Sequence, residues 1–199
     1  RELLNLHQIV SEQLKKVGFT TDSPLLIACS AGVDSMVLLD VVRQTCSNIV
    51  VAHCNFGLRG EESDLDEACV VDYCEEHDIK CYTKRFETET EQRGGESIQM
   101  VARRLRYDWF NNLLDDERIS LMVLAHHLDD QVETFFLNAI RGTGLKGLAG
   151  MPVLNGNRFR PFLEVEKSQL EEYAKTNCLA FRTDGSNADN KYTRNKFRN

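Results

Sequence analysis

The sequence predicts an α/β fold, a doubly wound and mostly parallel sheet with helices on both faces. Short apolar runs of strand length alternate along the chain with longer segments in which apolar residues recur at helical spacing. The runs at 25–29, 48–53 and 119–125 show no polar alternation, as expected for strands covered on both faces. Polar residues follow each run, and doubly wound sheets bind ligands at the carboxyl ends of their strands.

Composition sets the class of protein. The chain has 199 residues, of which 42% are hydrophobic, and this is enough for one domain over residues 1–199. No apolar run approaches the roughly 18 residues of a membrane span and no secretory leader is evident, so we expect a cytoplasmic protein without a membrane partner. The seven cysteines include no C-x-x-C pair, which argues against a zinc ribbon or a dithiol redox centre. The net charge of -7 indicates that any nucleic-acid contact is local, for instance at the basic end 191–199.

The first two elements are an amphipathic helix within residues 1–19, closed by Gly18, and a strand at 25–29. The stretch 30–35 then forms a turn into a second helix. Its residues 30–32 (Ser-Ala-Gly) carry almost no side chain, so a phosphate could approach the backbone amides at the positive end of the helix dipole. Asp34 and Ser35 are expected to cap this helix.

The strand at 48–53 leads into a polar segment with His53, Asn55 and Arg59 at its carboxyl end. Taken alone, His53 is better explained as a strand-end histidine bonded to a backbone carbonyl. Ser63 and Asp66 have the spacing of a capping box, which predicts a helix from Ser63 to about residue 77.

An alternating strand at 79–86, more exposed than the others, precedes a polar loop at 87–96. Ser97 is expected to begin a helix to Leu114. Its predicted inward side chains are Met100, Val101, Leu105 and Trp109. Its three arginines are Arg103, Arg104 and Arg106, which are suited to bidentate phosphate contact or to solvent.

The strand at 119–125 runs directly into His126, His127, Leu128, Asp129 and Asp130. Carboxylates at the end of a strand could hold Mg²⁺ together with phosphate oxygens. A transition-metal site built from both histidines and Asp130 is the alternative. We favour magnesium because adjacent histidines at the start of a helix point to different sides.

The rest of the chain predicts a helix at 129–141, a glycine-rich loop at 142–151, an edge strand at 158–162 and a helix at 166–177 with Leu170 and Tyr173 inward. The edge position is expected because Pro161 cannot donate to a ladder. The loop contains a formal G-x-G-x-x-G, but this motif follows a helix rather than a strand, so it is not a dinucleotide fingerprint. Arg141 and Lys146 flank or lie in this loop as candidate phosphate partners.

The stretch S-A-G-V-D-S at 30–35 resembles the S-G-G-x-D-S loop of the ATP pyrophosphatase (PP-loop) family, whose members cleave ATP between its α and β phosphates. Ala31 departs from that pattern, and its methyl group is harmless at negative φ and unfavourable at positive φ. Further segments resemble the tRNA(Ile)-lysidine synthetase branch of the family: H-C-N with L-R, A-R-R-L-R-Y, the run HHLDDQVETFFLNAIRGTGLKGLAGM, and the ending T-R-N-K-F-R.

This resemblance implies a PP-loop fold of the adenine nucleotide α-hydrolase type and an ATP-dependent carbon–nitrogen ligase. The implied reaction joins free L-lysine to C2 of the wobble cytidine of an isoleucine tRNA with a CAU anticodon, through an adenylated tRNA, and forms lysidine. An amide-forming or thiolating PP-loop enzyme and a non-catalytic nucleotide-binding adaptor are the alternatives. The ending within T-R-N-x-x-R indicates a fragment that lacks further RNA-binding domains, and a homodimer is a candidate assembly.

The resemblance also implies individual roles. The implied ATP-binding residues are Ser30, Ala31, Gly32, Val33, Asp34, Ser35, His53, Asn55, Arg59 and His126. The implied catalytic residues are Asp34, Arg103, Arg106, Asp129 and Asp130, with magnesium on Asp34 and on Asp129 or Asp130. The implied contacts with RNA are Arg141, Lys146, Arg194, Asn195 and Arg198.

Overall fold

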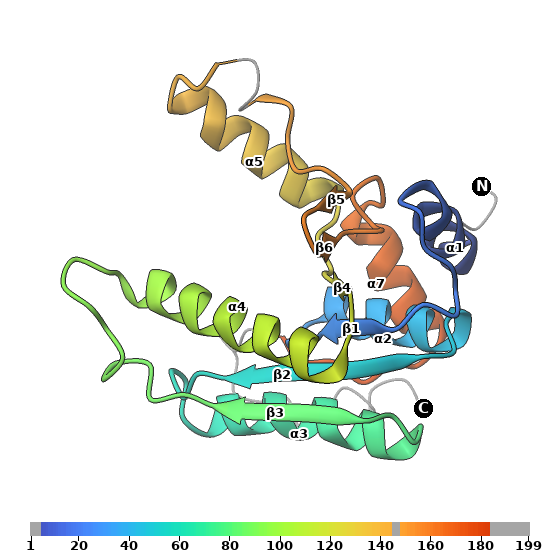
Figure 1. The fold of residues 1–199 in the computed structure, drawn as a ribbon, viewed down its shortest axis with the longest axis horizontal. Helices are drawn as coiled ribbons and strands as arrows, with labels where there is room; N and C mark the ends of the chain where they lie inside the picture. The colour runs from blue at the N-terminus through green and yellow to red at the C-terminus, as the bar shows by residue number, and fades with distance from the viewer. Residues whose placement is uncertain (1–4, 145–147, 184–199) are drawn as a thin grey trace.

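The computed structural model describes residues 5–144 and 148–183, and its centre is a six-stranded sheet (Figure 1). The strands are β1 (Leu25–Ala28), β2 (Ile49–Asn55), β3 (Cys81–Arg85), β4 (Leu121–Val123), β5 (Leu154–Asn155) and β6 (Arg158–Phe159). They lie in the order β3-β2-β1-β4-β6-β5, and every pair is parallel except β5 with β6. The expected mostly parallel α/β sheet is confirmed.

Helices cover both faces of this sheet, but unequally. The described helices are α1 (Leu6–Lys16), α2 (Val33–Thr45), α3 (Glu61–Glu76), α4 (Ile98–Glu117), α5 (Leu128–Ile140), which projects away from the sheet (Figure 1), and α7 (Lys167–Thr176). The buried side chains of α1, α2, α3 and α7 pack with Leu25 and Ile27 on one face, whereas α4 packs with Leu26 on the other. This alternation along β1 is what a strand buried on both faces requires. In the part of the chain that the structure describes, no helix has the length and apolar character to cross a bilayer.

The topology places a ligand crevice between two particular strands. From β1 the chain moves outward to β2 and β3, then returns to β4 on the opposite side of β1. Strand order therefore reverses at the β1–β4 pair, and α/β sheets bind ligands beyond the carboxyl ends of the strands at such a switch point. The loops at 29–32 and 124–127 leave the sheet there.

Both helix starts assigned to internal caps were wrong. The N-cap of α2 is Gly32 rather than Asp34 or Ser35, because the Ser35 hydroxyl donates back to Gly32 O (3.1 Å) and accepts from Ser30 N (3.0 Å). Helix α3 begins at Glu61, behind Gly60, so Ser63 and Asp66 lie inside it. The predicted cap at Ser97 is confirmed, since its side chain accepts from Met100 N at 3.2 Å.

Two predicted positions also needed correction. Met100 was expected inside but is 56% exposed, because the first turn of α4 overhangs the ends of the strands (Figure 1). The segment 158–162 was expected at an edge, but β6 lies between β4 and β5. Pro161 falls beyond the last residue of β6, so its missing N–H interrupts no ladder.

Other predictions were right. The exposed strand at 79–86 is β3, at one edge of the sheet. Helix α7 buries Leu170 fully and packs Tyr173 partly against the core.

Candidate active site

The loop between β1 and α2 is closed on itself and opens its backbone outward. Besides the bonds of Ser35, Ser30 Oγ lies 3.1 Å from Ser35 Oγ. Gly32 caps α2 without a side-chain acceptor, so the first amides of a 13-residue helix remain available for an anion. This arrangement is suited to phosphate binding.

Ala31 itself adopts a strained backbone conformation in this loop. It is fully buried and has a φ of +76°, a region that favours glycine. The carbonyl of Ala31 accepts from Arg182 N at 2.8 Å, and Gly32 pairs with Arg182 in a parallel bridge. The unfavourable alternative considered for this alanine is therefore the one found.

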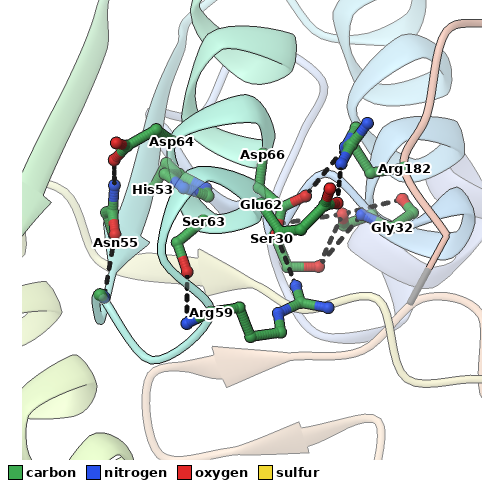
Figure 2. A network of polar contacts seen from close by, with 12 residues as sticks. Ser30, Gly32, His53, Asn55, Arg59, Glu62, Ser63, Asp64, Asp66 and Arg182 are labelled. Atoms are coloured by element: carbon green, nitrogen blue, oxygen red, sulfur yellow. Dashed lines mark hydrogen bonds and ion pairs between the residues drawn. The ribbon is translucent and has the colours of Figure 1, made fainter. Parts of the chain in front are cut away.

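Arg182 anchors this contact to α3 (Figure 2). Its side chain is buried, donates from Nε to Asp66 Oδ1 at 3.2 Å and forms an ion pair with Glu62. Arg59 Nη2 donates to the second carboxylate oxygen of Asp66, Oδ2, at 2.6 Å. The sequence reasoning missed Arg182, because a single arginine after an apolar residue gives no signal of its own.

One histidine joins the two loops of the switch point. His127 Nε2 lies 3.0 Å from Asp34 Oδ2 and 3.4 Å from Asp130 Oδ2, and His127 N donates to Asp130 at 2.8 Å. Burial raises the pKa of Asp34, and His127 opposes that effect. The second oxygen of Asp34 is buried without a hydrogen-bond partner. Two carboxylates predicted to act together are thus brought together through an imidazole.

Asp129 contacts His127 more loosely, with its Oδ1 4.0 Å from His127 Nδ1, and His126 faces elsewhere. Asp129 is 58% exposed and accepts from the backbone N–H of Lys167 at 3.3 Å. His126 Nδ1 accepts from Arg160 Nε at 3.1 Å, and since a guanidinium only donates, the imidazole proton lies on Nε2. Burial and Arg160 lower the pKa of His126, so it is neutral. The expectation that the two histidines point to different sides is confirmed.

A cavity of about 350 Å³ lies over β1 and β4 on the α4 side. We call it the α4 cavity. Its polar side chains include Asp34, Asp130, His126 and Arg106, and its apolar wall includes Tyr107 and Phe110. It has the mixed lining of a small-molecule site.

His53 and Asn55 are not among the residues that line this cavity; Cys54 between them is. Successive strand residues point to opposite faces, so β2 turns 53 and 55 away from α4. His53 Nδ1 donates to Cys29 O at 2.8 Å, and burial lowers its pKa. The Asn55 amide donates to Asp64 (Figure 2). It also donates to Glu67 and accepts from Gly57 N. The carbonyl-bonded interpretation of His53 fits the geometry.

The three arginines of α4 separate in space. Arg106 reaches the α4 cavity, over the ring of Phe56 at 5.2 Å. Arg103 is exposed and lies over Tyr107 at 5.0 Å. Arg104 is bonded to Glu96 Oε1 at 2.9 Å and to Glu91 O, and so ties the loop 87–96 to the helix. The preference for Arg103 and Arg106 over Arg104 is consistent with this ion pair.

The predicted RNA contacts are placed only in part. Arg141 ends α5 as its C-cap and is exposed. Lys146, Arg194, Asn195 and Arg198 lie outside the described residues.

A phosphate-binding loop after β1, an acidic loop after β4 and a cavity between them define a nucleotide-binding α/β domain. The model of the PP-loop domain family matches residues 4–199, and the chain belongs to this family. The expected membership is confirmed.

Within the family, the similar curated proteins are called tRNA(Ile)-lysidine synthase. That of Bacteroides thetaiotaomicron is 42% identical over 183 residues, which cover 90% of this chain and 42% of the relative. That of Bacillus subtilis is 38% identical, with 87% and 39% covered. The chain therefore spans about two fifths of the length of these relatives.

Solved structures share the fold at lower identity. The U34-tRNA thiolase NcsA from Methanococcus maripaludis aligns with a TM-score of 0.71 and 17% identity, covering 96% of this chain and 69% of that one. An NH3-dependent NAD synthetase from Campylobacter jejuni aligns with a TM-score of 0.60 and 14% identity, covering 88% and 75%. At such identities the likeness concerns the fold alone.

Proposed function

We propose that this chain uses ATP to join free L-lysine to C2 of the wobble cytidine of an isoleucine tRNA with a CAU anticodon. The observation that carries the proposal is the pairing of Asp34 in the PP-loop with His127 and Asp130, because those residues belong to the two sequence segments that resemble lysidine synthetases. Relatives with this name match about nine tenths of the chain. The cytoplasm is the proposed compartment, as the place of the tRNA.

ATP would lie across the loop. The open amides at the start of α2 and the hydroxyls of Ser30 and Ser35 would bind phosphate oxygens. The α4 cavity would take the nucleoside, with the Nε2–H of His126 as a donor inside it. The adenosine contacts predicted for His53 and Asn55 stay predictions, since both side chains are bonded within the protein.

The carboxylates fit a magnesium ion that is shared with phosphate. Asp34 has a buried oxygen without a hydrogen-bond partner, and Asp130 contacts the same His127 nitrogen as Asp34 does. Within residues 5–144 and 148–183, no three His, Cys, Asp or Glu side chains are arranged to hold a metal by themselves, so phosphate oxygens would complete the shell. Asp34 and Asp130 are therefore the proposed ligands in preference to Asp129, and the ion would neutralise phosphate charge.

The chemistry is positioning and charge stabilisation. The C2 carbonyl oxygen of the cytidine would attack the α phosphate and release pyrophosphate, and the lysine amine would then displace AMP. Arg106, at the wall of the α4 cavity, would stabilise the α phosphate in both steps. Exposed Arg103 and Arg141 would contact RNA outside the cavity.

The test is pyrophosphate release with ATP, magnesium and lysine, with and without the isoleucine tRNA. We expect release that depends on this tRNA and falls at least about 100-fold in Asp34→Asn, the size of loss typical for a charged group acting at a reacting phosphate. Asp116→Asn, an exposed carboxylate on α4, is the matched control. Release with another acceptor but not with this tRNA would reject the lysidine reaction and favour an amide-forming or thiolating enzyme. ATP binding without release in a longer chain would favour an adaptor.

A further inference from the structure

A second and larger cavity, of about 700 Å³, shares Ser30, Gly32 and Asp34 with the α4 cavity but has different outer walls. We call it the α7 cavity. Its further lining comes from Val33 at the start of α2, from α3 and the segment before it, from α7 and from the end of the described chain: Arg59, Asp66, Lys167, Glu171, Lys175, Phe181, Arg182 and Thr183.

Helix α7 presents one charged face to this cavity. Lys167, Glu171 and Lys175 are four residues apart, so they lie on one side of the helix over about 12 Å. In the described part of the chain neither lysine side chain forms an ion pair within 4.0 Å. Lys167 lines the same cavity as Asp34.

The other cations of the cavity are already engaged. Arg182 is bonded to Asp66 and Glu62, and Arg59 is bonded to Asp66. Among the described residues, Lys167 and Lys175 are therefore the cations of this cavity whose charge no carboxylate of the protein neutralises in an ion pair. The first turn of α2 lines both cavities, with Val33 only in this one and Ser35 only in the α4 cavity, so the positive end of the α2 dipole also faces the α7 cavity.

We propose that the α7 cavity receives the diphosphate end of ATP, and that Lys167 and Lys175 bind it. The proposal rests on the proposed function and adds the residues that take the leaving group. When the attacking oxygen bonds to the α phosphorus, the bond from that phosphorus to the bridging oxygen breaks. The electron pair stays on the bridging oxygen, and pyrophosphate leaves with one more negative charge. Ammonium groups on the far wall of the α7 cavity stabilise that charge.

Direct binding tests this assignment without turnover. Affinities of inorganic pyrophosphate, ATP and AMP would be measured by calorimetry in magnesium for the chain and for Lys167→Gln, Lys175→Gln and the double variant. We expect each single change to weaken pyrophosphate and ATP about tenfold, as loss of a charge-assisted contact of roughly 1.4 kcal/mol would do, with AMP within about twofold. Lys16→Gln, an exposed lysine at the end of α1, is the control and should change nothing.

Glu171 gives a test of opposite sign. Removing its charge in Glu171→Gln should tighten pyrophosphate severalfold if the cavity holds an anion. If the cavity instead holds an amine such as free lysine, the same variant would weaken L-lysine binding and leave pyrophosphate alone, and this would overturn the proposal. Equal losses of AMP and pyrophosphate in the lysine variants would overturn it too. If pyrophosphate binding depends on Lys167 and Lys175 but the chain makes no lysidine, only the proposed function is rejected.

Discussion

Asp34 Oδ2 and His127 Nε2 lie 3.0 Å apart, although 93 residues separate them in the chain. The contact joins the loop after β1 to the loop after β4, across the point where strand order reverses. It also leaves Asp34 with one buried oxygen that has no hydrogen-bond partner. The carboxylate that the proposed chemistry needs therefore lowers the stability of the chain when no ligand is bound.

Asp34→Asn should therefore stabilise the chain while abolishing ATP-dependent activity. A carboxyl whose pKa is raised by folding costs stability once pH exceeds that pKa, and the cost disappears where the acid is neutral in both states. We expect a higher Tm at pH 7, by about 2–4 °C per kcal/mol for a chain of this size. The difference should vanish at about pH 2.5, well below the unfolded pKa of about 3.9. Thermal unfolding at both pH values checks this, and a lower Tm at pH 7 would contradict it. Asp116→Asn should leave Tm unchanged.

Substitutions of Ala31 should separate strain from packing. Glycine removes the cost of the positive φ but also a buried methyl worth about 0.8 kcal/mol and adds chain entropy, so Ala31→Gly should stay within about 1 kcal/mol of the parent. Valine is β-branched and fills a closed site, so Ala31→Val should lose about 3 kcal/mol or more and most ATP affinity. Urea unfolding and ATP calorimetry would decide. A well-tolerated valine would mean that the loop does not hold Ala31 at positive φ.

Arg182 and Arg59 share Asp66 and form a matched pair. Arg182 is buried, so Arg182→Gln should cost about 3 kcal/mol by leaving Oδ1 of the buried Asp66 without its cation. The Arg59 side chain is 45% exposed, so Arg59→Gln should cost about 1 kcal/mol or less. Denaturant unfolding of the two variants measures the difference. Equal costs would show that Arg182 does not brace the loop.

Acid should weaken the fold through His53. Burial lowers its pKa in the folded chain, so its contribution is present above the unfolded pKa of about 6.5 and is lost as pH falls. His53→Asn keeps a donor toward Cys29 O and removes the titration. The loss of stability between pH 7 and pH 5.5 should then be smaller than in the parent chain, while His126 still contributes its own share. Identical pH profiles would exclude this role of His53.

Local pattern was enough to predict the described helices and every described strand except β5, in the right order, and the polar loops that follow β1 and β4. The uninterrupted apolar runs, the small residues 30–32 and the pair Asp129-Asp130 can each be recognised from residues that are adjacent in the sequence. The first residues of the helices were harder to predict. The N-caps of α2 and α3 are Gly32 and Gly60, whereas the serines and aspartates expected to cap these helices make other contacts inside the fold.

The rest of the site depends on contacts that no local pattern encodes. Arg182, Arg160 and Tyr107 become site residues only when distant elements meet. The phase of β2 decided that Cys54 and not His53 faces the α4 cavity, and one residue of register changes that outcome. The choice between Asp129 and Asp130 likewise required the position of His127.

Helix α5 buries none of its side chains and exposes Phe135, Phe136 and Ile140 as it projects from the body (Figure 1). A helix with so few packing contacts opens by local unfolding at much lower free energy than the core, so its amides should exchange with solvent hydrogen well before those of α2. Asp130 belongs to its first turn. One of the two proposed magnesium ligands therefore stands on a helix with no buried side chain and the other on a helix packed in the core, and ligand binding would couple their opening.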